Sequence, residues 1–158
     1  FFENEQPFVF HILMGEDNPD GKLRKDSFHH FCNPERNASY GIYRYNLGTA
    51  GAVELKKTIY GFYEREIKFD SLFNLKTDDL MYCSEMIKKA LARSTKNGII
   101  IPTTALTEAD SRFLALLANI PELYTRNLEI VAIDNLYINP HCRLIREYKY
   151  PTDDPFFN

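Results

Sequence analysis

The sequence predicts one α+β domain, and three observations lead to that fold class. The chain has 158 residues, a length at which folding buries roughly 68–70% of the unfolded chain's surface and supports a single core. Hydrophobic residues make up 44% and aromatic residues 14% of the chain, which is a globular composition. Segments with strand-like and helix-like patterns come in blocks and do not alternate as strand–helix–strand units, which indicates segregated strands and helices.

The first third of the chain is predicted to be strand and loop. Residues 1–13 indicate an aromatic strand end, a polar turn and a second strand over residues 7–13. Residues 14–22 have the composition of a loop, and a short helix is predicted around residues 27–31. A further strand is predicted over residues 39–47, where tyrosine and isoleucine favour the extended backbone.

Two amphipathic helices are predicted in the middle of the chain. Apolar residues at helical spacing predict the first over residues 52–64, and a polar connector follows over residues 68–79. The second starts at Cys83 and ends at residues 97–98, where Asn-Gly favours a left-handed cap. Its predicted apolar stripe has the i, i+3, i+4, i+7, i+8 spacing and consists of Cys83, Met86, Ile87, Ala90 and Leu91.

The second half of the chain is predicted to contain three more strands or extended segments and one helix. Residues 99–102 indicate a short strand or extended edge, and a helix is predicted over residues 107–119, starting at a Thr-x-x-Asp cap. Strands are predicted over residues 128–133 and 142–150. Residues 151–158 are predicted to be a tail.

Composition excludes several classes of partner. The net charge of −3 and the scattered lysines and arginines give no basic face, so nucleic acid is not an expected partner. No apolar run reaches 18 residues, so no membrane-spanning segment is predicted. The three cysteines form no CxxC pair, which indicates neither a disulfide framework nor a zinc ribbon.

Several histidines and cysteines could be combined into a metal site, but their spacing along the chain is poor for metal ligation. Adjacent histidines point to opposite sides of a strand, and lie about 100° apart on a helix. No metal and no cofactor is therefore predicted. The residues considered are His29, His30, Cys32, His141 and Cys142.

Cys83 has two interpretations from its position alone. It is either the first core residue of its helix or a nucleophile at the helix N-terminus. Unpaired N–H groups and a partial positive charge at a helix N-terminus favour thiolate over thiol and lower the pKa of a cysteine. A buried inert cysteine is the common fate of a lone Cys on an apolar stripe.

The residues around Cys83 resemble a known family. Tyr-Cys-Ser-Glu at residues 82–85, preceded by Phe-Asp at residues 69–70, looks like the signature of the circularly permuted papain-like amidases of the YiiX/YaeF type. That family is related to the NlpC-like cysteine peptidases and to lecithin retinol acyltransferase. Residues 7–13, 39–46 and 133–150 resemble, less specifically, other segments in the order that the family shows.

The resemblance implies a fold and a set of roles. The fold would be a single permuted papain-like domain over residues 1–150, with an antiparallel sheet or partial barrel packed on helices. Cys83 would be the nucleophile. The base histidine would lie just upstream of Phe1, in residues that the gene encodes and this chain lacks. His11 would hold that imidazole in its productive orientation.

Glu85 points about 200° away from Cys83 along the helix, so it is expected to serve the first helical turn or an internal hydrogen bond.

The function implied is a cysteine-dependent hydrolase. It would cleave an amide bond of a cell-envelope peptide or related acyl amide through a thioester on Cys83, with backbone N–H groups at the helix start meeting the oxyanion. One alternative is a lipid acyltransferase or esterase of the lecithin retinol acyltransferase-like branch. Another is a catalytically inactive papain-like domain that only binds ligands. The resemblance alone suggests a periplasmic or secreted location; the sequence indicates neither the substrate nor the oligomeric state.

Overall fold

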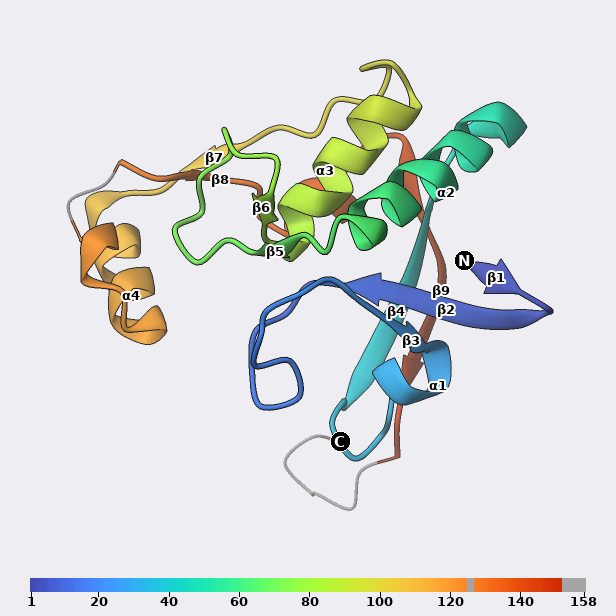
Figure 1. Ribbon diagram of the computed structural model, residues 1–158, viewed down its shortest axis with the longest axis horizontal. Helices are drawn as coiled ribbons and strands as arrows, with labels where there is room; N and C mark the ends of the chain where they lie inside the picture. The colour runs from blue at the N-terminus through green and yellow to red at the C-terminus, as the bar shows by residue number, and fades with distance from the viewer. Residues whose placement is uncertain (125–126, 152–158) are drawn as a thin grey trace.

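Residues 1–124 and 127–151, which the computed structural model describes, form a mixed α+β structure (Figure 1). The helices α2 and α3 lie side by side, and α4 lies apart from them beside β7 and β8. The elements in chain order are β1 (Phe2–Glu3), β2 (Gln6–His11), β3 (Arg24–Ser27), α1 (Phe28–Phe31), β4 (Ser39–Tyr45), α2 (Gly48–Glu64), β5 (Lys68–Phe69), β6 (Leu80–Met81), α3 (Cys83–Ser94), β7 (Thr104–Ala105), α4 (Glu108–Ala118), the 3₁₀ turn η1 (Pro121–Leu123), β8 (Glu129–Ile130), α5 (Asp134–Tyr137) and β9 (Cys142–Lys149).

The described strands form four small sheets, which corrects the expectation of one antiparallel sheet or partial barrel. Their orders are β1-β2-β3, β4-β9, β5-β6 and β7-β8. The β5-β6 pair is parallel and the other pairs are antiparallel. Because β2 bonds only to β1 and β3, and β4 only to β9, no described strand bridges the two larger sheets. A closed barrel is therefore absent from the described part of the chain.

The N-terminal hairpin forms as the sequence predicts. Asn4 and Glu5 connect β1 to β2 with φ of 49° and 66°, left-handed values that suit a two-residue type I′ turn. The predicted strands at residues 39–47 and 142–150 are also confirmed, as β4 and β9. They pair from Ser39↔Lys149 to Tyr45↔Cys142, with a register shift between residues 42 and 43.

The helices are confirmed, with shifted ends. The first central helix starts at Gly48, earlier than predicted. The second starts at Cys83 as predicted and ends at Ser94, before the predicted Asn-Gly cap. The left-handed residues after it are Lys96 and Asn97, with φ of 50° and 62°, so Gly98 does not supply the turn.

The region after residue 98 differs most from the prediction. The helix α4 has the expected cap, in which the Thr107 hydroxyl accepts from the Asp110 N–H at 3.2 Å. Residues 99–102 lie outside the described ladders, and burial of Ile99 and Ile101 holds them in place without strand pairing. The predicted strand at residues 128–133 shortens to β8. Of the predicted tail, residues 152–158 lie outside the described residues.

The helix α3 separates two hydrophobic core clusters. Met86 and Ala90 face the first core cluster, and Leu91 faces the second. Ile87, which the sequence places on the same stripe, is 37% exposed, so this part of the predicted core is wrong. The first core cluster consists of Ile12, Leu23, Ile59, Phe62, Ile67, Met81, Met86 and Ala90. The second core cluster consists of Tyr82, Leu91, Ile99, Ile101, Val131 and Leu136.

Replacing Phe62 should destabilise the protein strongly. Phe62 is 1% exposed in the first core cluster, so Phe62→Ala leaves a cavity and should lower the free energy of unfolding by about 3–5 kcal/mol. Urea unfolding followed by circular dichroism measures this. As a control, Phe113→Ala on α4, where the ring is 63% exposed, should change the free energy by no more than about 0.5 kcal/mol. Equal losses in the two variants would contradict the assignment of the core.

Candidate functional site

Cys83 is the first residue of α3, as the sequence predicts. Tyr82 before it is extended, with φ of −100° and ψ of 170°. The Met86 N–H donates to the Tyr82 carbonyl at 2.9 Å and makes the first helical hydrogen bond. The N–H groups of the first turn have no carbonyl partner within the helix. The thiol is therefore placed beside a group of backbone donors.

The Cys83 side chain is partly exposed. It packs against the first core cluster without being sealed inside it. Burial raises the pKa of the Cys32 thiol and of the Cys142 thiol. Cys32 is buried and Cys142 is half-buried beside Tyr45. The inert-core interpretation therefore fits Cys32 better than Cys83.

Glu85 serves the first turn of α3, as expected. It is fully buried, and its carboxylate accepts from the Tyr82 N–H at 3.3 Å. Lys89 lies one turn further along the helix and pairs with Glu85 at 2.8 Å. Burial raises the pKa of Glu85, and the hydrogen bond and charge of Lys89 act in the opposite direction. The buried carboxylate of the first turn is thus paired with a partly buried lysine of the next turn.

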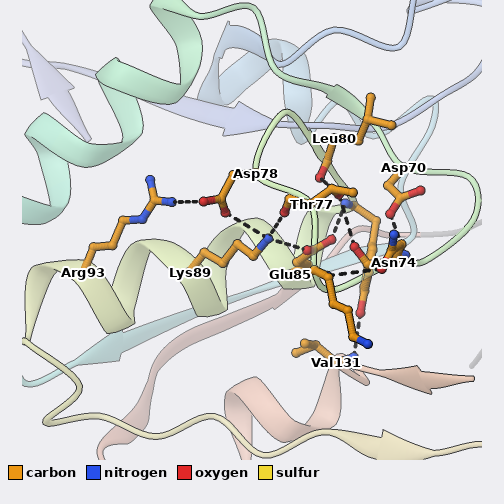
Figure 2. A network of polar contacts seen from close by, with 11 residues as sticks. Asp70, Asn74, Thr77, Asp78, Leu80, Glu85, Lys89, Arg93 and Val131 are labelled. Carbon is orange, nitrogen blue, oxygen red and sulfur yellow. Dashed lines mark hydrogen bonds and ion pairs between the residues drawn. The ribbon is translucent and has the colours of Figure 1, made fainter.

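The same lysine connects the helix to the preceding loop. Lys89 donates to the Thr77 carbonyl and lies 3.2 Å from Asp78, which also pairs with Arg93 at 3.1 Å (Figure 2). These contacts attach residues 77–78 to α3. The i, i+4 spacing of Lys89 from Glu85 is a signal of this pair in the sequence.

Asp70 organises the other end of this loop. Its side chain is 2% exposed and accepts from the Leu72 N–H at 2.9 Å and the Asn74 N–H at 2.6 Å. Phe69 pairs with Met81 in the parallel β5-β6 ladder, directly before Tyr82. The Phe-Asp pair of the motif therefore shapes the approach to Cys83.

Tyr82 and Ser84 are both buried, and both bond to Val131. The Val131 N–H donates to the Tyr82 hydroxyl at 2.7 Å, and the Ser84 hydroxyl donates to the Val131 carbonyl at 2.6 Å. Burial raises the pKa of Tyr82 to about 12, so this phenol stays neutral at physiological pH. No local pattern predicts these contacts, because Val131 is 47 and 49 residues away from Ser84 and Tyr82 along the chain.

His11 lies on the face of the hairpin opposite to the one that packs on α2. Side chains alternate along a strand, and Phe10 packs against Tyr60 and Tyr63 of α2, with ring centroids 5.1 and 5.6 Å apart. His11 points the other way, and its Nε2 lies 2.7 Å from Asp26 Oδ2. Its ring packs on Phe31 at a centroid distance of 4.9 Å.

The structure does not bring His11 and Cys83 together. His11 lines a cavity of about 690 Å³ with the loop residues 13–18 and 36–37, and Cys83 is not in its lining. Within residues 1–124 and 127–151, no hydrogen bond or ion pair joins Cys83 to a histidine. A second cavity of about 900 Å³ lies between β4-β9 and α2 and includes Phe1, Leu55, Leu91 and His141, again without Cys83.

The metal-ligating residues are dispersed. No group of three or more His, Cys, Asp and Glu side chains gathers to hold a metal ion in the part of the chain that the structure describes. No described helix is both long and apolar enough to cross a bilayer.

Comparison with known proteins supports the fold but shows no function. No protein-family model matches the sequence, and no curated protein matches it. The structure is similar to the crystal structure of the metalloprotein yiiX from Escherichia coli, with a TM-score of 0.69 over 94% of this chain and 79% of that chain. The sequence identity is 18%, so the likeness concerns the fold alone.

Removing Lys89 should make stability depend strongly on pH. Lys89→Met leaves the buried Glu85 carboxylate without its charge partner and should cost about 3–5 kcal/mol at neutral pH. Burial of Glu85 is then opposed by the Tyr82 N–H but no longer by Lys89, so the folded-state pKa of Glu85 rises further above the unperturbed 4.5. The folded state keeps a proton that the unfolded chain releases, so stability should fall as pH rises above about 4.5 and return below it. Urea midpoints from pH 4 to 8 measure this.

Two variants control this experiment. Lys88→Met removes a neighbouring lysine that forms no ion pair with the described residues and should change stability by no more than about 0.5 kcal/mol. Glu85→Gln combined with Lys89→Met should abolish the added pH dependence. A pH dependence that survives in the double variant would show that another group is responsible.

Proposed function

We propose that the protein is a cysteine-dependent hydrolase that cleaves an amide bond of a cell-envelope peptide or related acyl amide. The observation that carries this proposal is the placement of Cys83. Its thiol is partly exposed at the first position of α3, while Tyr82, Ser84 and Glu85 around it are buried and hydrogen-bonded. A fixed helix start beside one accessible sulfur suits nucleophilic catalysis.

The proposed chemistry has two halves. The Cys83 thiolate attacks the carbonyl carbon, the C–N bond breaks, and the amine leaves with a proton. Water then attacks the thioester, which releases the carboxylic acid and restores the thiol. In both halves, N–H groups of the first turn of α3, including the Cys83 N–H, donate hydrogen bonds to the oxyanion.

The base is proposed to come from a strand preceding Phe1. The Phe8 N–H donates to the Phe1 carbonyl at 2.7 Å, and the Phe1 ammonium donates to the Phe8 carbonyl at 2.9 Å. A strand continuing β1 backwards would therefore lie beside Phe10 and Ile12 of the β2 edge. Ile12 belongs to the core cluster on which Cys83 packs. An imidazole on such a strand would approach the thiol, in keeping with the resemblance.

The position of His11 does not favour the orienting role. The orienting role requires His11 to face that imidazole, whereas its Nε2 is bonded to Asp26 on the far side of the hairpin. The acyltransferase alternative drew on the same histidine and loses support for the same reason.

A ligand-binding domain without catalysis is the second candidate. One observation favours it, namely that no histidine among the described residues forms a hydrogen bond or ion pair with Cys83. Such a domain would bind the same ligands without turning them over.

Cys83 should be alkylated first among the three cysteines. Iodoacetamide at pH 7 should modify Cys83 well ahead of Cys32 and Cys142, because burial raises the pKa of the latter two thiols and the helix N-terminus attracts a thiolate at Cys83. Peptide mass mapping over time measures the order. Cys32→Ala and Cys142→Ala serve as controls and should leave the rate at Cys83 unchanged. Equal, slow labelling of all three thiols would favour the binding domain.

Cys83→Ala should abolish turnover and leave the fold intact. The side chain is partly exposed, so the thermal midpoint should stay within a few degrees, roughly the effect of 1 kcal/mol or less. Turnover of acyl amides is measured with the chain extended by whatever residues its gene encodes before Phe1, and with the 158-residue chain beside it. Unfolding of Cys83→Ala would restore the inert-core interpretation.

A further inference from the structure

Val131 is held by the two residues on either side of Cys83. Its N–H donates to the Tyr82 hydroxyl at 2.7 Å, and its carbonyl accepts from the Ser84 hydroxyl at 2.6 Å. All three residues are 5% exposed or less. Val131 appears with this network in Figure 2, below the start of α3. We name these two hydrogen bonds the Val131 clamp.

The Val131 clamp pairs both the backbone N–H and the backbone carbonyl of the buried residue Val131. Val131 directly follows β8, which ends at Ile130. A buried N–H or carbonyl without a partner costs free energy, and here side chains from α3 supply both partners. The two donor–acceptor pairs join positions 49 and 47 residues apart. The helix start is therefore attached to a distant segment of the chain.

The clamp fixes the residue that lies between its two arms. Helix ends commonly fray, and fraying at α3 would let the Cys83 sulfur and the first-turn N–H groups move independently. Holding Tyr82 and Ser84 to the same residue, Val131, restrains the backbone on both sides of Cys83. Donors fixed in advance toward a developing negative charge contribute most to catalysis.

We propose that Tyr82 and Ser84 are positioning residues that act through Val131 to hold the Cys83 thiol against the N–H groups of the first turn. This inference rests on the proposed role of Cys83 as the nucleophile. Neither hydroxyl needs to touch the substrate. Each acts by restraining the first turn of α3, so that the Cys83 sulfur and the N–H groups of that turn keep their relative positions.

The same helix offers a matched comparison for a purely structural role. Ser94 is also buried, at 8% exposure, and its hydroxyl donates to the Leu91 carbonyl of its own helix at 3.1 Å. Tyr45 donates its hydroxyl to the Leu136 carbonyl, away from Cys83. Removing either hydroxyl costs a hydrogen bond and leaves the clamp intact.

The test is the rate of Cys83 alkylation by iodoacetamide as a function of pH, measured well below the unfolding temperature of each variant. Ser84→Ala and Tyr82→Phe should each slow Cys83 alkylation at pH 7 by about threefold to tenfold, the equivalent of one lost hydrogen bond, and move the pH profile to higher pH. Ser94→Ala and Tyr45→Phe should leave the rate within about twofold of the unmodified protein. Ser84→Thr keeps the hydroxyl and should restore most of the rate.

The outcomes separate the inference from the proposed function. If Ser84→Ala and Tyr82→Phe lower the thermal midpoint while Cys83 keeps its rate and pH profile, the clamp is only structural and the inference is overturned. If Ser84→Ala does not fold, the comparison of Tyr82→Phe with Tyr45→Phe decides the question alone. If Cys83 of the unmodified protein reacts no faster than Cys142, the proposed function fails, whatever the variants show.

Discussion

The structure around Cys83 depends on one ion pair, whose carboxylate is buried. The Glu85 carboxylate is fully buried in the first turn of α3 and is compensated by Lys89 and by the Tyr82 N–H. A buried charge that loses its partner is strongly destabilising, so these groups must stay together whenever the protein is folded. Lys89 also binds the loop before the helix through Thr77 and Asp78. One compensated charge thereby fixes where the helix begins.

The packing of α3 then determines which of its side chains stay accessible to solvent. Because α3 lies between the first and second core clusters, Met86 and Leu91 are buried on different sides of it. Tyr82, Ser84 and Glu85 are also buried at its start. Within this first turn Cys83 keeps a partly exposed side chain, which is the combination of rigid backbone and accessible sulfur that nucleophilic chemistry requires.

The β2-β3 hairpin places His11 and Cys83 on opposite sides of its sheet. The face of β2 that carries Phe10 packs on α2, and the opposite face carries His11 beside Asp26. Alternation along a strand cannot place both faces toward the same helix. His11 therefore does not face the Cys83 side of the hairpin, and the imidazole of the proposed mechanism is not His11.

Local patterns in the sequence determined the α+β class, the helix start at Cys83, the cap at Thr107 and the strands over residues 39–47 and 142–150. Each follows from periodicity or from hydrogen bonds between residues a few positions apart. Only the tertiary structure decided that Ile87 is exposed and that His11 faces away from Cys83. It also decided that the two neighbours of Cys83 bond to Val131. These outcomes depend on which distant segments meet, and chain spacing carries no information about contacts between residues nearly fifty positions apart.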